Sequence, residues 1–222
     1  MGASAADRRE ELIALYREVQ ACQKCPLHAT RTNVVFGSGN ADADLMFVGE
    51  APGHHEDQQG KPFVGAAGKL LEKLLADIGL NREDVFIANV LKSRPPGNRD
   101  PQPEEIEACK PYLARQVELI EPLVICTLGN FSTKLLTRRQ DGITRVHGKP
   151  QQHTIGGLEV TIYPIYHPAA GLRSQAMLTT LREDFGRLPE LLAAARPQPE
   201  PEEPQGGGST EPVAVSQLGL FG

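Results

Sequence analysis

The stretch LMFVGEAPG, residues 45–53, decides the fold that we expect for this chain. An apolar run long enough for a buried strand is followed at once by glycines and a proline around Glu50, which is typical of a tight loop at a strand end. Apolar runs of similar length recur at 85–90, 123–128 and 160–166. The stretch therefore predicts the first strand of a sheet built from these runs.

Segments with helical periodicity lie between and around the apolar runs. They are predicted at 6–20, 66–79, 103–120, 129–137 and 174–194. Strands that alternate with helices usually pair in parallel, so we expect an α/β protein, a three-layer α/β/α sandwich with a four-stranded parallel sheet. In such sheets the functional site lies at the carboxyl ends of the strands.

Composition changes abruptly near Arg196. Residues 197–222 contain five prolines, five glycines and four glutamates, and such a segment cannot bury enough surface to offset the entropy of ordering it. We predict one domain over residues 1–196 and a disordered acidic tail over 197–222. Because the tail carries four of the five net negative charges, the acidity of the whole chain does not exclude a nucleic-acid partner.

The chain shows no targeting signal. No apolar stretch is long enough to span a bilayer, and the first residues lack the basic and apolar pattern of a signal peptide. We therefore predict a cytoplasmic, nucleoid-associated protein with no membrane partner. In a reducing compartment, four cysteines more often bind metal or take part in catalysis than form disulfides.

The four cysteines allow three interpretations. Cys22 and Cys25 form a C-x2-C pair before Pro26, whereas Cys109 falls on a predicted helix and Cys126 in the third predicted strand. In the first, the chain has a close pair and two buried core cysteines that bind nothing. In the second, the four thiolates bind zinc. In the third, they are the ligands of a [4Fe–4S] cluster. The wide spread of the later two favours the cluster over zinc, but spacing alone leaves the choice open.

Polar residues of special kinds stand at the predicted strand ends. Glu50 follows the first strand, Asn89 ends the second and His167 follows the fourth. An asparagine amide both donates and accepts, so it can bind the edge of a base. Basic residues at 92–99 and 138–149 would supply positive charge near such a site. The segment GAAGKL, 65–70, lacks the spacing and hydroxyl residue of a phosphate loop, which excludes nucleoside-triphosphate hydrolysis.

Four motifs, in this order and with the four cysteines, resemble those of a family 4 uracil-DNA glycosylase of the bacterial iron–sulfur type. They are GEAPG at 49–53, KPFVG at 61–65, NVLKSRPPGNRDP at 89–101 and HPAA at 167–170, and the resemblance runs over about residues 20–190. It implies a [4Fe–4S] cluster on the cysteines at 22, 25, 109 and 126. It also implies an enzyme that hydrolyses the N-glycosidic bond of deoxyuridine in single- or double-stranded DNA, releasing uracil and leaving an abasic site.

The resemblance assigns roles at the reacting bond. Glu50 would orient the attacking water, and His167 would stabilise negative charge on uracil O2; the sequence leaves the protonation state of His167 open. Related families often place an aspartate where this chain has Ala51, so water activation rests on Glu50.

The resemblance also implies residues that bind the base and the DNA. The base-binding set is Gly49 and Ala51 of the loop that faces the uracil carbonyl, Phe63 as a stacking ring, Asn89 on the Watson–Crick edge, and Glu56 near C5, where it would exclude thymine. The DNA-binding set is Arg94 and Arg99 in the basic loop, with Leu172 or Arg173 as a wedge in the duplex.

The last residues carry a second motif. QLGLF, 217–221, resembles the pentapeptide by which bacterial repair and replication proteins bind the sliding clamp. Gln217 would fix the orientation, and Leu218, Leu220 and Phe221 would anchor the peptide, with the tail as a flexible tether. We expect a monomer with uracil-containing DNA and this clamp as partners.

Two other functions remain alternatives. One is a glycosylase of the same fold that accepts a broader range of deaminated bases. The other is a non-catalytic iron–sulfur protein that binds nucleic acid, against which the complete set of Glu50, Asn89 and His167 argues.

Overall fold

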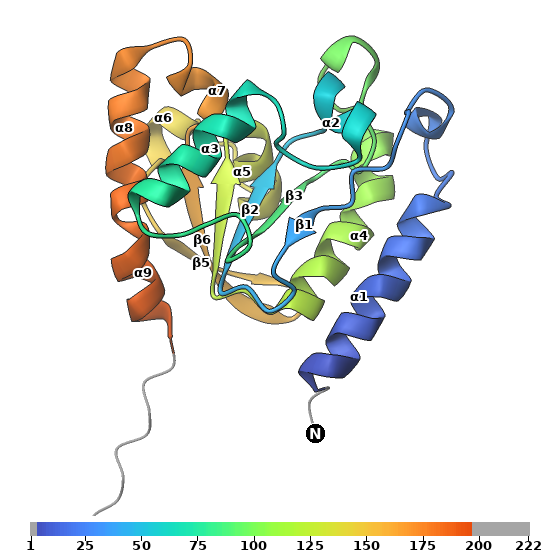
Figure 1. Cartoon of the computed structure of the whole chain (residues 1–222), viewed down its shortest axis with the longest axis horizontal. Helices are drawn as coiled ribbons and strands as arrows, with labels where there is room; N and C mark the ends of the chain where they lie inside the picture. The colour runs from blue at the N-terminus through green and yellow to red at the C-terminus, as the bar shows by residue number, and fades with distance from the viewer. Residues whose placement is uncertain (1–3, 197–222) are drawn as a thin grey trace, which may run out of the picture.

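A six-stranded sheet forms the centre of the computed structural model, which describes residues 4–196 (Figure 1). The strand order is β1-β3-β2-β4-β6-β5. The four inner strands pair in parallel, as predicted, and are β3 (Phe86–Asn89), β2 (Leu45–Gly49), β4 (Val124–Leu128) and β6 (Leu158–Ile165). The α/β class is therefore confirmed.

The two edge strands were not predicted. β1 (Ser38–Gly39) and β5 (Gln151–Ile155) pair antiparallel with β3 and β6. β1 is only two residues long, and β5 alternates between half-buried and exposed residues without an apolar run. An edge strand with one solvated face gives a weak hydrophobic signal, so the sheet is wider than the expected four strands.

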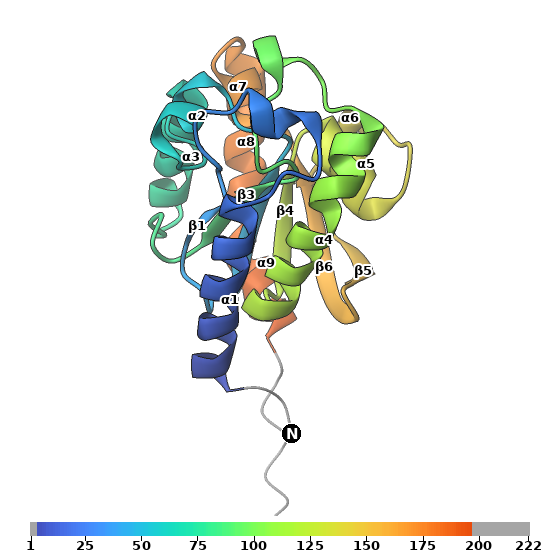
Figure 2. The same cartoon turned by 90° about the vertical axis from the view of Figure 1, so that its right-hand side faces the viewer.

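Helices cover both faces of the sheet (Figures 1 and 2). One layer consists of α3 (Ala66–Asp77), α8 (Gln175–Gly186) and α9 (Leu188–Ala195). The opposite layer consists of α1 (Ala5–Gln20), α4 (Pro103–Ile120) and α5 (Asn130–Thr137). Each parallel strand turns alternate side chains toward the two layers, and this alternation divides the core into two clusters.

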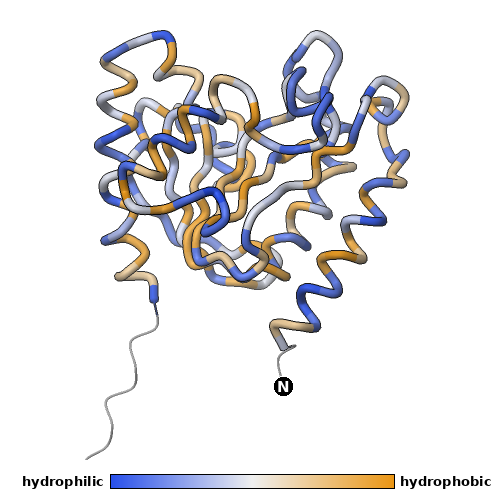
Figure 3. Tube along the Cα trace, in the orientation of Figure 1, coloured by the Kyte–Doolittle hydropathy of each residue, from blue (hydrophilic) through white to orange (hydrophobic). Residues whose placement is uncertain are grey.

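Apolar residues concentrate on the central strands in Figure 3, whereas α1 alternates between apolar and polar residues along its length. Every residue of β2 and β4 is buried, as expected for parallel strands covered on both faces. In α1 only Leu12, Leu15 and Val19 are buried, so this helix packs by a narrow stripe.

The helix predicted over 174–194 is divided in two. α8 ends at Gly186 and α9 begins at Leu188, with Pro189 in its first turn. Proline has no N–H to continue the hydrogen-bond ladder of a preceding helix, but it fits the first turn of a new one. Short helices that periodicity did not reveal lie in the loops: η1 (Pro26–Ala29), α2 (His54–Gln59), η2 (Pro96–Asn98), α6 (Ile143–Val146) and α7 (Pro168–Gly171).

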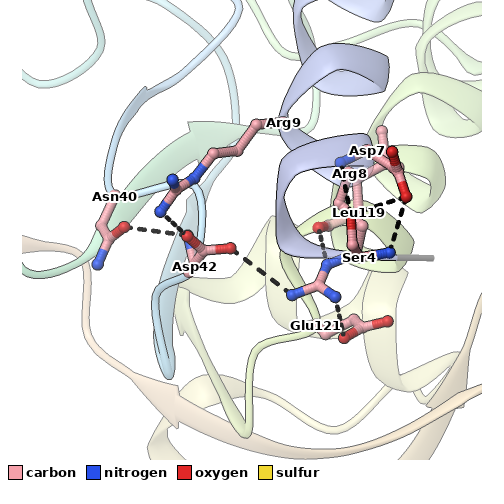
Figure 4. A network of polar contacts seen from close by, with 8 residues as sticks. All are labelled: Ser4, Asp7, Arg8, Arg9, Asn40, Asp42, Leu119 and Glu121. Carbon is pink, nitrogen blue, oxygen red and sulfur yellow. Dashed lines mark hydrogen bonds and ion pairs between the residues drawn. The ribbon is translucent and has the colours of Figure 1, made fainter. Parts of the chain in front are cut away.

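Polar contacts anchor the start of α1 (Figure 4). Arg8 Nε donates to the Leu119 carbonyl at 3.2 Å, and its guanidinium pairs with Glu121 at 3.3 Å and with Asp42 at 3.6 Å. Arg9 also pairs with Asp42. These contacts fix α1 against the end of α4 and the loop before β2, and thereby position the C-x2-C segment that follows α1.

Within residues 4–196, the helices lack the combination of length and apolar character that crossing a bilayer requires.

Candidate active site

A cleft of about 820 Å³ opens at the carboxyl ends of the parallel strands. It brings together residues that are far apart in the sequence: Glu50 after β2, Phe63 before α3, Asn89 at the end of β3 and His167 after β6. α2 and α7 stand on this side of the sheet, at the top of Figures 1 and 2. The site therefore lies where the topology of a parallel sheet predicts it.

Gly49 lets two of these side chains approach the strand end. A Cβ at this position would lie 2.4 Å from Asn89 Oδ1 and 2.8 Å from Phe63 Cζ. Both distances are shorter than any ordinary contact, and neither the ring nor the amide has room to retreat, because Phe63 is 6% and Asn89 2% exposed. The missing side chain of Gly49 thus lets Asn89 and Phe63 lie against the end of β2.

Several contacts hold the Phe63 loop in shape. Phe63 adopts a positive φ of 53°, which is uncommon for a bulky residue. Its carbonyl accepts a 2.9 Å hydrogen bond from Arg82, and α3 starts so close to it that a Cβ on Gly68 would lie 1.7 Å from the carbonyl oxygen. The unusual backbone is therefore held from two sides.

Glu56 lines the cleft, but its carboxylate is engaged with the backbone. Oε1 accepts hydrogen bonds from the N–H groups of Val64 and Gly65, both at 2.9 Å. These residues directly follow Phe63, so Glu56 holds the loop that carries the Phe63 ring. The predicted role of Glu56 near uracil C5, where it would exclude thymine, stays a prediction.

His167 is a neutral imidazole with a defined tautomer. The Ala169 N–H donates to Nδ1 at 3.1 Å, so Nδ1 accepts and the proton of the neutral ring lies on Nε2. Burial lowers the pKa of His167 to about 4; Glu56 opposes this shift and Arg173 adds to it. The ring stacks on Phe63 with centroids 5.6 Å apart. At neutral pH this side chain offers one N–H donor.

Glu50 is half-buried at the mouth of the same cleft. Burial raises the pKa of its carboxyl group above the ordinary value, and the nearby carboxylate of Asp100 raises it further. Asp100 also lines the cleft, and sequence reasoning gave it no role although the NRDP motif contains it. Its place beside Glu50 follows from the turn after η2, which residue type alone did not reveal.

The predicted DNA-binding residues have different surroundings. Arg99 pairs through both nitrogens with the buried Glu105, at 2.9 and 2.6 Å, so its charge is largely matched within the protein. Arg94 donates to Asn98 at 2.6 Å. Arg173 lines the cleft, and Leu172 beside it is 52% exposed. A large exposed apolar side chain next to the cleft suits the wedge predicted at 172 or 173.

Lys92 was expected in a basic loop, but it is a buried structural residue. Its ammonium donates to the Asn89 carbonyl at 2.7 Å and to Gln116 Oε1 at 2.6 Å, and Gln116 in turn donates to the Phe36 carbonyl at 2.9 Å. Burial lowers the pKa of Lys92 to about 7. The lysine braces the strand end that carries Asn89 and is almost completely shielded from solvent.

The four cysteines do not meet. Cys22 and Cys25 pack against the core cluster that contains Cys109, on the α1–α4 face of the sheet. Cys126 is fully buried in the other cluster, among Phe47 and Tyr163 on the α3–α8 face. The prediction that Cys126 shares a site with the other three is therefore wrong. Spacing could not show this, because adjacent residues of a strand point to opposite faces.

The strand-end cleft of this α/β/α sandwich combines a neutral histidine donor, a carboxylate and a buried amide, as a base-removing glycosylase requires. The model of the uracil DNA glycosylase superfamily matches residues 36–186. The type-4 uracil-DNA glycosylase of Archaeoglobus fulgidus is 50% identical over 192 residues, covering 85% of this chain and 96% of that protein.

Two further relatives agree with this. The type-4 uracil-DNA glycosylase of Saccharolobus solfataricus is 50% identical and covers 83% of this chain and 88% of its own length. The type-4 uracil-DNA glycosylase of Thermotoga maritima is 48% identical, and the match covers 76% of this chain and 87% of that protein. The chain belongs to the uracil DNA glycosylase superfamily, and its similarity is to the type-4 enzymes.

Proposed function

We propose that this chain is a DNA-repair glycosylase that hydrolyses the N-glycosidic bond of deoxyuridine in DNA, releases uracil and leaves an abasic site. The observation that carries this proposal is the neutral His167, whose free Nε2–H shares one cleft with Glu50, Phe63 and Asn89. The type-4 relatives support uracil as the base removed.

Recognition of the base rests on Phe63 and Asn89. A duplex hides the glycosidic bond, so the nucleotide must leave the stack before it can react. Stacking on an aromatic ring returns about 1–3 kcal/mol of the lost stacking energy. The Asn89 amide, fixed by Gly49 and by the strand end that Lys92 braces, both donates and accepts, as the Watson–Crick edge of uracil requires.

Bond cleavage rests on His167 and Glu50. As the N–C1′ bond breaks, negative charge grows on the uracil and positive character grows on the sugar. A donor fixed beforehand at uracil O2 stabilises the leaving group, and a neutral imidazole does this without releasing its proton. The Glu50 carboxylate stabilises the sugar cation and orients the water that attacks C1′.

The DNA surface surrounds the cleft. Arg173 and Leu172, at the end of α7, would contact the duplex and fill the gap that the extruded nucleotide leaves. Arg94 and Arg99 would act nearby, with Arg99 contributing less because Glu105 already neutralises it. A basic rim around a cleft supplies the phosphate contacts that binding requires.

The predicted clamp motif lies outside the described residues. We expect Gln217, Leu218, Leu220 and Phe221 to bind a bacterial sliding clamp, and the domain to act as a monomer. A synthetic peptide of residues 213–222 should bind a purified clamp, and its Leu220→Ala/Phe221→Ala form should not. Equal binding by the two peptides, or none by either, would exclude this partner.

The four-cysteine [4Fe–4S] site implied by the resemblance does not fit this chain, because Cys126 is on the wrong face of the sheet. A three-thiolate site on Cys22, Cys25 and Cys109 does fit. Such a group would tie the end of α1 to α4. No step of uracil excision passes through it.

Excision is tested with full-length protein and an oligonucleotide that contains one uracil, followed by alkali. We expect a strand break at the uracil position with the wild type, and none with a folded His167→Ala/Asn89→Ala variant. Oligonucleotides with hypoxanthine or xanthine test the broader specificity. Absence of a strand break, or equal cleavage by both proteins, would exclude the proposed activity.

A further inference from the structure

Three thiols form a thiol region on the α1–α4 face of the sheet. Cys22 and Cys25 stand in the segment after α1, and Cys109 lies on the buried face of α4. Cys109 interacts with the backbone N–H of Lys92, and Cys22 and Cys25 act on it electrostatically. The mutual electrostatic effect agrees with the packing, which brings the three sulfurs to one side of the core.

Ser93 is a buried polar residue beside this thiol region. It is 4% exposed and directly follows Lys92, whose backbone contacts Cys109. The Ser93 hydroxyl accepts a 3.2 Å hydrogen bond from Arg31, and the charge of Arg31 also acts on Cys25. Ser93 is thus connected to Cys109 through its neighbour Lys92, and to Cys25 through Arg31.

The Tyr112 hydroxyl is a separate observation that points to another group in the thiol region. It is buried, and no described residue meets it with a regular hydrogen bond; its nearest interactions are with Cys22 and Lys24. A buried hydroxyl normally has a partner. The sulfur atoms of a cluster bound beside Cys22 would supply the acceptor.

The arrangement favours a cluster over a single ion. Among residues 4–196, no three cysteine, histidine or acidic side chains converge closely enough to bind one metal ion. The thiolates of an iron–sulfur cluster bind separate irons at its corners, so they stand further apart than the ligands of one zinc ion.

We propose that this chain binds an iron–sulfur cluster through Cys22, Cys25 and Cys109, with Ser93 at the fourth corner, where the iron is held weakly and is lost on mild oxidation. A serine hydroxyl is a hard and usually protonated ligand, whereas the irons of a sulfide cluster prefer soft thiolate. Cys126 takes no part. The proposal is independent of uracil excision.

The oxidation can be written in full. Ferricyanide, a one-electron oxidant, takes one electron from [4Fe–4S]²⁺. The oxidised cluster then releases the iron at the Ser93 corner as Fe²⁺, because its bonds to Ser93 and to three sulfides break. The remaining [3Fe–4S]⁺ keeps its three thiolate bonds. No bond to Cys22, Cys25 or Cys109 breaks in this step.

The test compares full-length wild type with Ser93→Cys, Ser93→Ala and Cys126→Ala, each reconstituted anaerobically with iron and sulfide. Iron content and the EPR signal of [3Fe–4S]⁺ are followed during ferricyanide titration. We expect wild type, Ser93→Ala and Cys126→Ala to lose one iron and give this signal, and Ser93→Cys to keep four irons at the same dose.

Three results would overturn the proposal. The first is a wild type that binds no iron or takes up zinc instead. The second is loss of the cluster in Cys126→Ala while that variant remains folded by circular dichroism. The third is equal lability of wild type and Ser93→Cys. Uracil excision, measured on the same samples, does not enter this decision, so failure of one proposal leaves the other intact.

Discussion

The backbone N–H of Ala169 donates a 3.1 Å hydrogen bond to Nδ1 of His167. This contact belongs to the first turn of α7, where His167 is the residue that caps the helix. It fixes the tautomer, because a nitrogen that accepts from a backbone N–H cannot itself carry a proton. The remaining Nε2–H is the donor on which the proposed chemistry depends.

The first prediction concerns the pH dependence of excision. Glu50 must be ionised to orient water, and burial together with Asp100 raises its pKa. The rate should therefore fall as pH decreases through this raised pKa. Because burial lowers the pKa of His167 to about 4, the imidazole is neutral from pH 6 to 8 and should add no second pH dependence in that range.

Two variants test this assignment. Asp100→Asn removes a negative charge near Glu50, so the acidic limb should move to lower pH. Glu50→Gln should lower the plateau rate by about 10²–10⁴-fold and remove the limb. The measurement is the single-turnover excision rate across the pH range. If the rate of Glu50→Gln still fell at acidic pH, a group other than Glu50 would be responsible for the fall.

The second prediction concerns Gly49. Gly49→Ala places a methyl group 2.4 Å from Asn89 Oδ1, which forces the amide or the Phe63 ring to move. We expect a stability cost of about 1–3 kcal/mol. Because misplacement of a binding group by about 1 Å can cost 10²-fold in rate, excision should fall by about that factor.

Gly186→Ala is the matched control. This glycine ends α8, has no heavy atom within 4 Å of the new Cβ and keeps an ordinary φ. Its thermal midpoint and excision rate should stay at or above those of the wild type. If Gly49→Ala and Gly186→Ala had the same thermal midpoint and excision rate, the close packing around Gly49 would not matter for stability or activity.

The third prediction separates two roles of Glu56. If Glu56 holds the Phe63 loop, Glu56→Ala frees the N–H groups of Val64 and Gly65 and loosens the loop by about 1–3 kcal/mol. Amide hydrogen exchange should rise at residues 62–66, and uracil excision should fall. Thymine excision should not appear. Gain of thymine excision with an unchanged loop would instead support a role near C5.

The fourth prediction concerns Lys92. Lys92→Met leaves the Asn89 carbonyl and Gln116 without their buried donor, which should cost about 1–3 kcal/mol for each unsatisfied group. Lys110→Met, at an exposed position on α4, is the control and should change stability little. Equal urea midpoints for the two variants would show that Lys92 does not brace the strand end.

The sequence predicted the inner sheet and the membership of the cleft. Fully buried parallel strands leave continuous apolar runs, and the strand-end rule then placed Asn89 and His167 at one edge. The missing edge strand β5 has no such run, because one of its faces is solvated. The hydrophobic pattern of the sequence thus identified the strands that are buried on both faces, but not the edge strands.

The errors in the site come from tertiary contacts that residue type does not encode. Lys92 belongs by composition to a basic loop, yet its buried partners Asn89 and Gln116 come from two different elements. Cys126 was grouped with the other cysteines by residue type, although the strand turns it toward α8. The side chains of a strand point alternately to the two helix layers. One sequence does not show which set of side chains faces which layer.

The most direct test is uracil release under single-turnover conditions from an oligonucleotide with one uracil, by full-length wild type and by His167→Ala. The central claim is that the Nε2–H of a neutral His167 stabilises the departing uracil. We predict a loss of about 10²–10³-fold in His167→Ala, the usual effect of removing one fixed donor to a developing anion, with oligonucleotide binding unchanged. Equal rates in the two proteins would contradict the account.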